Sequence, residues 1–170
     1  MAFTWGVGDL GFKVADEREC CDACRAHARV CGQPGSAGRE FFTPSLGSGS
    51  ARCHNEEANA RRACNVFAYC PLERCFSFDI HRHERHECWL KYDVSPERPA
   101  AGTSGEYPAA MVAAPREKWP WAVAEDVWAE PMPKLNTWLS GALLPRGSPP
   151  AQAKAPHTIE AWCEREPGRC

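Results

Sequence analysis

Four cysteines lie within the stretch "ECCDACRAHARVC", which runs from Glu19 to Cys31. Cysteine thiolates can ligate zinc, a Cys-x-x-Cys pair such as Cys21 and Cys24 can exchange disulfides, and cysteines of an oxidised chain pair covalently. The stretch therefore leaves three kinds of chemistry open: metal ligation, thiol redox catalysis, and one half of a disulfide framework whose partners lie further along the chain.

A zinc site would need a second, closely spaced pair of ligands. Structural zinc sites usually combine two tight pairs at matched spacing. The remaining candidates are Cys64, Cys70 and Cys75, and the spacing Cys70-x4-Cys75 is loose. Zinc binding is therefore the alternative to a disulfide framework, and we assign no metal ligand and no cofactor.

Catalytic chemistry is poorly supported by the motifs. A thioredoxin-like pair lies where a strand meets a helix, with its first thiol at the helix N-terminus. Cys21 is instead expected about one turn inside a helix. The sequence has no G-x-S-x-G, no H-E-x-x-H and no glycine loop that would hold a phosphate. We therefore expect no catalytic residue and no enzyme activity.

The stretch "HRHERHEC" is the second group of residues that could do chemistry. His81 and His83 would point the same way on a strand, which is compatible with a metal site, but a solvated hairpin tip is the expected structure. The same tip is the candidate binding surface, formed by His81, Arg82, His83, Arg85 and His86. Its histidines would gain charge as the pH falls through ~6.5, which would strengthen binding of an acidic partner. The competing interpretation is a hairpin that only adds solubility.

The composition bounds the class of protein: 170 residues, eleven cysteines and a formal net charge of −2. This cysteine content is typical of small proteins from oxidising compartments, so we expect a secreted, extracellular chain, although its first residues lack the pattern of a signal peptide. The chain has no excess of basic residues, so binding to nucleic acid is not expected. Its longest apolar runs are far shorter than the ~20 residues that span a membrane. Because eleven is odd, at least one thiol is free or pairs with another chain.

Local patterns predict the elements that would position these residues. Residues 15–30 are expected to form a helix, with Asp16 as N-cap and Glu19 completing a capping box. Cys20 and Cys24 lie four residues apart and share one face of that helix. The other expectations are strands at 64–70, 75–80 and 88–94, an edge strand within 4–12, a loop insertion at 32–63 with a helical turn at 54–63, a short helix within 120–131 and a late strand at 136–144. This order indicates an α+β fold with an antiparallel sheet.

Two residue types separate the chain into a core and a later segment. Nine of the eleven cysteines lie between Cys20 and Cys88, whereas twelve of the fifteen prolines follow residue 95. Five of the seven tryptophans follow residue 118. Such tryptophans either form an exposed platform for sugars or peptides or pack in the core, and we expect the core.

Three blocks of the chain, "ADERECCDACRAHARVC", "CNVFAYC" and "CFSFD…ECWLKYD", together resemble the PAN/apple domain family, in particular its variant in secreted proteins of plants and green algae. The leading "GDLG" and the later "W-x-S-G-A-L" also look like that variant. The matching parts cover residues 8–31 and 64–93, and less fully 136–145. The chain departs from the family at 32–63, where the family has a few residues, and Cys53 has no family counterpart.

The resemblance implies a fold and two disulfides. The family fold is a curved antiparallel sheet of about five strands that cradles one α-helix. Carried over to the matching positions, the resemblance implies that Cys24 pairs with Cys64 and that Cys20 pairs with Cys88.

The remaining cysteines of the core allow more than one connectivity. Cys70 and Cys75 bridge across the "PLER" turn, or one of them pairs with Cys21. A bridge between Cys31 and Cys53 would then close the insertion.

The resemblance also implies a domain organisation and a function. A PAN/apple-like domain is expected at 1–145, with a motif core at 8–93, followed by an irregular tail at 146–170. Apart from the resemblance, the turn residues Pro167 and Gly168 predict that Cys163 and Cys170 close a local loop in this tail. Domains of this family are non-catalytic modules that bind extracellular proteins or carbohydrates. We therefore expect a recognition or structural module with a protein or polysaccharide ligand on its loops and exposed sheet face, and a zinc-binding cysteine/histidine module is the alternative.

Overall fold

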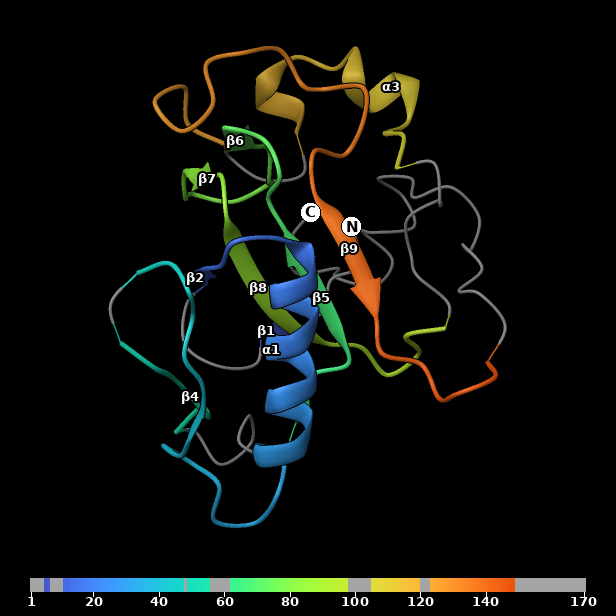
Figure 1. The fold of residues 1–170 in the computed structure, drawn as a ribbon. Helices are drawn as coiled ribbons and strands as arrows, with labels where there is room; N and C mark the ends of the chain where they lie inside the picture. The colour runs from blue at the N-terminus through green and yellow to red at the C-terminus, as the bar shows by residue number, and fades with distance from the viewer. Residues whose placement is uncertain are drawn as a thin grey trace.

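The computed structural model of the chain describes residues 5–6, 11–47, 49–55, 62–97, 105–119 and 123–148. One main helix and several short strands make up a small α+β fold with antiparallel sheets, as the sequence predicts (Figure 1). In chain order the elements are β1 Trp5–Gly6, β2 Phe12–Lys13, α1 Glu17–Val30, β3 Glu40–Phe42, β4 Ala51–Arg52, β5 Val66–Tyr69, β6 Arg74–Cys75, β7 His83–Glu84, β8 Glu87–Tyr92, α3 Ala109–Val112, the 3₁₀ turn η1 Arg116–Lys118, and β9 Leu139–Ala142.

The central sheet has five strands and is antiparallel throughout. Strand β8 pairs on one side with both β1 and β2 and on the other side with β5, which in turn pairs with β9. The register places Phe67 opposite Leu90 and Tyr69 opposite Cys88. Because side chains alternate between the two faces of a sheet, these four residues lie on the same face, and all four are buried.

Helix α1 begins at the residue that the sequence predicts. The Asp16 side chain caps it by accepting a hydrogen bond from the backbone N–H of Glu19 over 2.8 Å. In a standard capping box the Glu19 carboxylate would accept the backbone N–H of the N-cap, Asp16. Here it accepts the N–H of the preceding residue, Ala15, at 2.6 Å. It also accepts the backbone N–H of Ser45 at 2.8 Å, so one carboxylate joins the helix start to the insertion.

Two disulfides attach α1 to the buried face of the sheet. Cys20 is bonded to Cys88 on β8, and Cys24 is bonded to Cys64 just before β5. Both pairs are the ones that the family resemblance implies. The four cysteines are buried and share a core cluster with Val14, Ala23 and the inward-facing residues of β5 and β8. The helix therefore covers one face of the sheet and is held there covalently.

The insertion at 32–63 is more ordered than the loop expected from its composition. Strands β3 and β4 form a two-stranded hairpin, which the Cys31–Cys53 disulfide closes onto the end of α1. The edge of the Phe41 ring meets the ring of His27 with centroids 4.9 Å apart. Residues 62 and 63 are not helical, and the rest of the helical turn predicted at 54–63 lies largely outside the described residues.

Residues 105–119 and 123–138, which are mostly loops with α3 and η1, lie on the side of the molecule that carries the β6–β7 hairpin (Figure 1). Arg74 and Arg82 donate hydrogen bonds to the backbone carbonyls of Val127 and Asp126, at 2.6 and 2.7 Å. A separate apolar core lies between these segments, with Phe76 at its centre and the other buried members being Met111, Trp119, Val123, Trp128 and Met132.

Two predicted elements differ from those observed. The strand expected at 75–80 ends at Cys75, where the next N–H, that of Phe76, donates to the Thr137 hydroxyl at 2.7 Å. Further on, Asp79 accepts the backbone N–H of His81 at 2.8 Å and turns the chain there. In the described part of 120–131 the helix is replaced by one turn, in which the N–H groups of Val127 and Trp128 both bond the carbonyl of Ala124.

Candidate functional site

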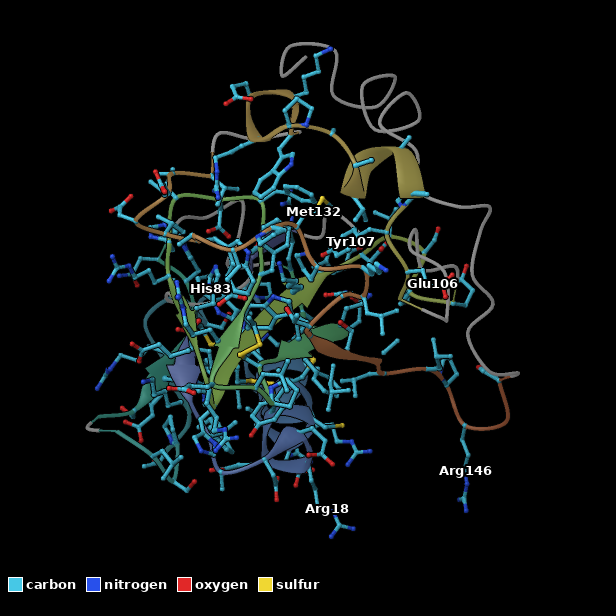
Figure 2. All side chains as sticks on the ribbon, turned by 90° about the horizontal axis from the view of Figure 1, so that it is seen from above. Arg18, His83, Glu106, Tyr107, Met132 and Arg146 are labelled. Atoms are coloured by element: carbon cyan, nitrogen blue, oxygen red, sulfur yellow. A yellow bond between two sulfur atoms is a disulfide. The ribbon has the colours of Figure 1, made fainter. Side chains whose placement is uncertain are left out.

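The histidine-rich tip is the first candidate, and the structure divides its residues. His83 is only 5 % exposed and lies inside the protein, under the segment that carries Trp138, whereas His81, Arg82 and Arg85 are exposed. The prediction of a solvated tip that includes His83 is therefore wrong. Figure 2 shows His83 among packed side chains, while Arg18 and Arg146 project away from the body of the protein.

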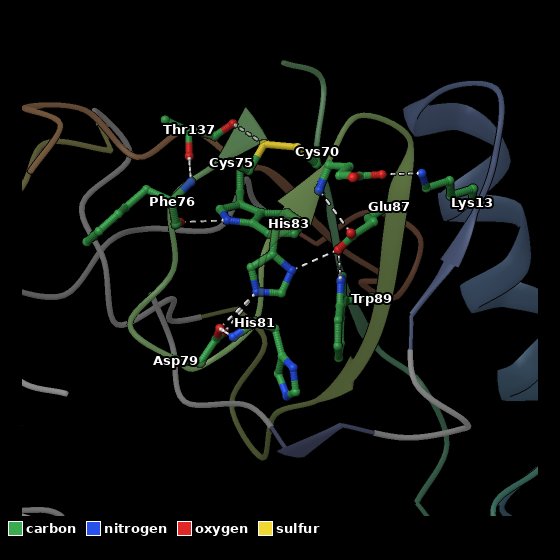
Figure 3. Close-up of polar contacts among 12 residues, drawn as sticks. Lys13, Cys70, Cys75, Phe76, Asp79, His81, His83, Glu87, Trp89 and Thr137 are labelled. Atoms are coloured by element: carbon green, nitrogen blue, oxygen red, sulfur yellow. Dashed lines mark hydrogen bonds and ion pairs between the residues drawn. A yellow bond between two sulfur atoms is a disulfide. The ribbon is translucent and has the colours of Figure 1, made fainter. Parts of the chain in front are cut away.

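Both nitrogens of the His83 ring contact carboxylates. Nδ1 lies 2.8 Å from Oε2 of Glu87, and Nε2 lies 2.9 Å from Oδ2 of Asp79 (Figure 3). Because a carboxylate accepts hydrogen bonds and does not donate them, both ring nitrogens must carry protons. His83 is therefore an imidazolium ion between two carboxylates.

Aromatic side chains enclose this ionic group. The rings of Trp89 and Trp138 approach the His83 ring edge-on, with centroids 5.4 and 5.1 Å away. Trp89 Nε1 donates to the Glu87 carboxylate at 3.0 Å, and Trp138 Nε1 donates to the carbonyl of Phe76 at 2.8 Å. Every polar atom around His83 thus has a fixed partner, which lowers the cost of burying charge there.

The environment shifts the pKa of each member of the group. Burial would lower the pKa of His83, but the hydrogen bonds to Asp79 and Glu87 outweigh burial and raise it to about 9. Burial acts to raise the pKa of both carboxyl groups, yet the hydrogen bonds from His83 bring each below its ordinary value. His83 is therefore charged at neutral pH and does not gain charge near pH 6.5, contrary to the sequence-based prediction.

Two of the other tip residues, Arg82 and His86, make contacts that stabilise the fold. Arg82 holds the turn at Asp126, as described above. His86 has a φ of 77° and its Nδ1 lies 3.1 Å from the Tyr69 hydroxyl, so it joins the tip to the central sheet. His81 and Arg85 remain exposed. The five predicted binding residues thus do not form one surface.

The geometry of His83 also determines what it can do chemically. A general base needs a free nitrogen lone pair, and an acid needs a proton directed at a substrate. Both His83 protons are instead directed at protein carboxylates. The arrangement fixes the β6–β7 hairpin to the start of β8 and serves the stability of the fold.

Eight of the nine cysteines between Cys20 and Cys88 are paired as disulfides. Besides the two helix–sheet bonds and Cys31–Cys53, Cys70 is bonded to Cys75 across the "PLER" turn. Cys21 is the free cysteine among the described residues and is half-buried, so its alternative pairing with Cys70 or Cys75 is wrong. The predicted Cys163–Cys170 bond lies outside the described residues.

Most of the cysteines proposed as zinc ligands are not available to bind a metal ion. The cysteines considered for it, apart from Cys21, form disulfides. Within the ranges that the structure describes, no group of three or more His, Cys, Asp or Glu side chains is arranged to hold a metal ion.

The tryptophans do not form an exposed platform where the structure describes them. Trp119, Trp128 and Trp138 are buried, and Trp89 is half-buried. The backbone of Gly11 lies so close to the indole of Trp89 that any side chain at this position would overlap the ring. The core interpretation is therefore correct for these four residues.

An open groove between α1 and β3 is a second candidate site. One of its walls belongs to the insertion at 32–63, among the loops expected to carry recognition, but the sequence did not single out the residues that line it. Its volume is about 530 Å³, and it is a shallow hollow largely open to solvent. The lining residues are Asp22, Ala26, Arg29, Glu40, Phe41, Phe42 and Thr43. The available signal was the spacing of Asp22, Ala26 and Arg29 at i, i+4 and i+7, which places them on one helix face. Nothing local predicted that the insertion would lie against that face.

Comparison of the chain with protein-family models, with curated proteins and with solved structures gives no match. Among the described residues, the helices are too short or too polar to cross a lipid bilayer.

Proposed function

We propose that the chain is a non-catalytic extracellular module that recognises a protein or polysaccharide partner. The observation that carries the proposal is the way in which disulfides hold the two walls of the α1–β3 groove. Cys20–Cys88 and Cys24–Cys64 fix the helix to the sheet, and Cys31–Cys53 fixes the hairpin to the end of the helix. A binding surface that is ordered before the partner arrives loses less entropy on binding.

The position of His83 supports a non-catalytic role. It is the residue with the largest potential for acid–base chemistry in the tip, and its two nitrogens are occupied by Asp79 and Glu87. The groove, in contrast, has an open shape and a mixed lining that suit recognition of another molecule.

The disulfide pattern supports a PAN/apple-like fold for residues 1–145. One helix lies across an antiparallel sheet, and the two bonds between them join the positions that match the family motif. An extracellular location is compatible with four disulfides in the described part of the chain, because such bonds persist in oxidising compartments.

The test is a binding screen with the oxidised chain on a sensor surface. The probes are a phage-displayed random peptide library and a polysaccharide panel that includes polygalacturonate, alginate and dextran. The control is the same chain after reduction and alkylation, which removes the disulfides and the fold. We expect saturable binding to at least one probe by the oxidised chain and its loss in the control.

Two outcomes would contradict the proposed function. One is the absence of saturable binding to any probe by a chain whose four described disulfides are verified by peptide mapping. The other is binding of equal strength by the oxidised and the reduced chain, because a folded recognition surface would then have no part in it.

A further inference from the structure

The α1–β3 groove has two walls of different character. One wall is the helix stripe formed by Asp22, Ala26 and Arg29, and the other is strand β3 with its two phenylalanines. Ala26 is small and 9 % exposed, so β3 can lie close to the helix there. Phe41 and Phe42 are half-buried and both pack on the edge of the main core, which leaves part of each ring at the groove surface.

The charges of the groove are not balanced. The carboxylate of Asp22 is paired with Arg25 at 3.1 Å, and that of Glu40 is paired with Arg52 at 3.7 Å. Arg29 lines the groove and is exposed, and no carboxylate in the described ranges comes within ion-pairing distance of its guanidinium. The groove therefore presents one unpaired positive charge beside two half-buried phenylalanines in a mixed polar and apolar lining.

We propose that this groove binds a peptide segment in which an acidic side chain adjoins an aromatic or large aliphatic side chain. The carboxylate of the peptide pairs with Arg29, whose planar guanidinium suits a carboxylate. The neighbouring apolar side chain packs on Phe41 and Phe42. This inference rests on the proposed recognition function and deepens it by naming the kind of partner and the residue that selects it.

A peptide fits these observations better than an acidic polysaccharide. Uronate and sulfate chains repeat their charges and are bound by several cations in a row. The groove has one unpaired arginine, which can pair with a single carboxylate and does not provide the row of cations that a chain of repeated anions needs. The phenylalanines, in turn, provide apolar area that a polar sugar chain uses poorly and a peptide side chain uses well.

The test measures fluorescence anisotropy of a labelled Gly-Asp-Phe-Gly peptide with the full oxidised chain at low ionic strength. Peptides with Asn in place of Asp, or Ala in place of Phe, are compared with it. The key protein variant is Arg29→Glu. Its matched control is Arg18→Glu, which makes the same charge change on the same helix at an exposed residue outside the groove. Disulfide mapping confirms that each variant is folded.

We expect Arg29→Glu to weaken binding of the Asp-Phe peptide by about tenfold. Arg18→Glu should change the affinity for this peptide by less than about twofold. The Asn-Phe peptide should bind wild type more weakly than the Asp-Phe peptide does. Arg29→Glu should reverse this preference, because its carboxylate repels Asp and does not repel Asn. Asp22→Asn, which removes a negative charge from the groove, should strengthen binding of the Asp-Phe peptide. Raising the salt concentration should weaken it.

Three results would overturn the inference while leaving the proposed function intact. The first is equal binding of the Asp-Phe peptide by wild type and by Arg29→Glu. The second is binding of polygalacturonate that depends on Arg29, with no binding of any peptide. The third is saturable binding of a screened partner that Arg29→Glu does not change. Absence of every partner in the screen would instead reject the proposed function itself.

Discussion

The Nδ1 atom of His27 accepts a hydrogen bond from the backbone N–H of Cys64 over 3.1 Å, across a sequence separation of 37 residues. An imidazole nitrogen that accepts a hydrogen bond carries no proton, so His27 is neutral in this structure. The residue is 1 % exposed, and its ring packs against that of Phe41, with centroids 4.9 Å apart. Burial lowers the pKa of His27 to about 4.

His27 should make the fold sensitive to acid. Its pKa is about 4 in the folded chain and ~6.5 in the unfolded chain, so the unfolded state takes up a proton first as the pH falls. We expect wild type to lose about 2 to 3 kcal/mol of stability from this residue between pH 7 and 4.5. Urea unfolding at both pH values measures the loss.

His27→Gln is the comparison for that measurement, since Gln offers a carbonyl to the N–H of Cys64 and does not titrate. Its stability should change much less over the same interval. The carboxyl groups of Asp79 and Glu87 have lowered pKa values and also cost stability in acid, but wild type and His27→Gln both contain them, so their contribution cancels in the comparison. Equal losses in wild type and His27→Gln would show that His27 is not the cause.

His83 should produce the opposite dependence on pH. Its pKa is about 9 in the folded chain and ~6.5 in the unfolded chain, so the stabilisation is complete below pH 6.5 and is lost as the pH rises to 9. The loss should be about 3 kcal/mol. We expect His83→Gln to be less stable at pH 6.5 and to lose much less stability on going to pH 9.5.

A second measurement covers the case in which His83→Gln does not fold. The imidazole resonances of wild type, followed by NMR, should show one histidine that remains protonated well above pH 7. A midpoint for His83 near 6.5 would contradict the ionic group as described.

Paired Cys→Ala replacements should destabilise the chain in the order of the loops that the bonds close. The sequence separations are 68 for Cys20–Cys88, 40 for Cys24–Cys64 and 5 for Cys70–Cys75. The chain-entropy relation gives about 4 kcal/mol for each of the two long loops and about 2 kcal/mol for the short one. Denaturant unfolding of the three double variants measures these values. A larger loss for Cys70–Cys75 than for Cys20–Cys88 would show that local packing outweighs loop entropy.

Gly141 on β9 should tolerate no side chain. It lies opposite Phe67, and a Cβ on it would overlap the Phe67 ring. Gly141→Ala is therefore expected to cost about 1–3 kcal/mol, because the buried ring must move. Ser140→Ala is the matched control on the same strand, where the side chain is exposed. Thermal unfolding of both variants separates the ring contact from a general effect on β9, and equal melting temperatures would count against the contact.

The parts of the fold that could be predicted are those with local signals or a family motif. Asp16 and Glu19 locate the start of the helix, and the four-residue spacing of Cys20 and Cys24 places both on its buried face. The alternation in "CNVFAYC" and "CWLKYDV" predicts β5 and β8. Capping, periodicity and alternation depend on near neighbours in sequence, which explains why these predictions succeed.

The candidate sites could not be predicted, because they depend on contacts between residues far apart in the sequence. His83 is buried because Trp138, from a segment more than fifty residues later, covers it, and its charge is balanced by acids four residues away on each side. The spacing Asp79, His83, Glu87 was a usable signal, but the surrounding "HRHERHE" is typical of a solvated turn. The groove arises where β3 lies beside α1, and the composition of the insertion predicted only a loop.

The disulfides of the cysteine-rich core are nested, and this has a mechanical consequence. Cys20–Cys88 encloses Cys24–Cys64, which encloses Cys31–Cys53. If the two ends of the chain are pulled apart, the span between Cys20 and Cys88 adds only the 5.5 Å between their Cα atoms. The same span without the bond would extend to roughly 230 Å, at about 3.4 Å per residue. Tension applied to the ends of the chain therefore bypasses β3 and the part of α1 that follows Cys20, and the groove keeps its shape under loads that would extend an uncrosslinked domain.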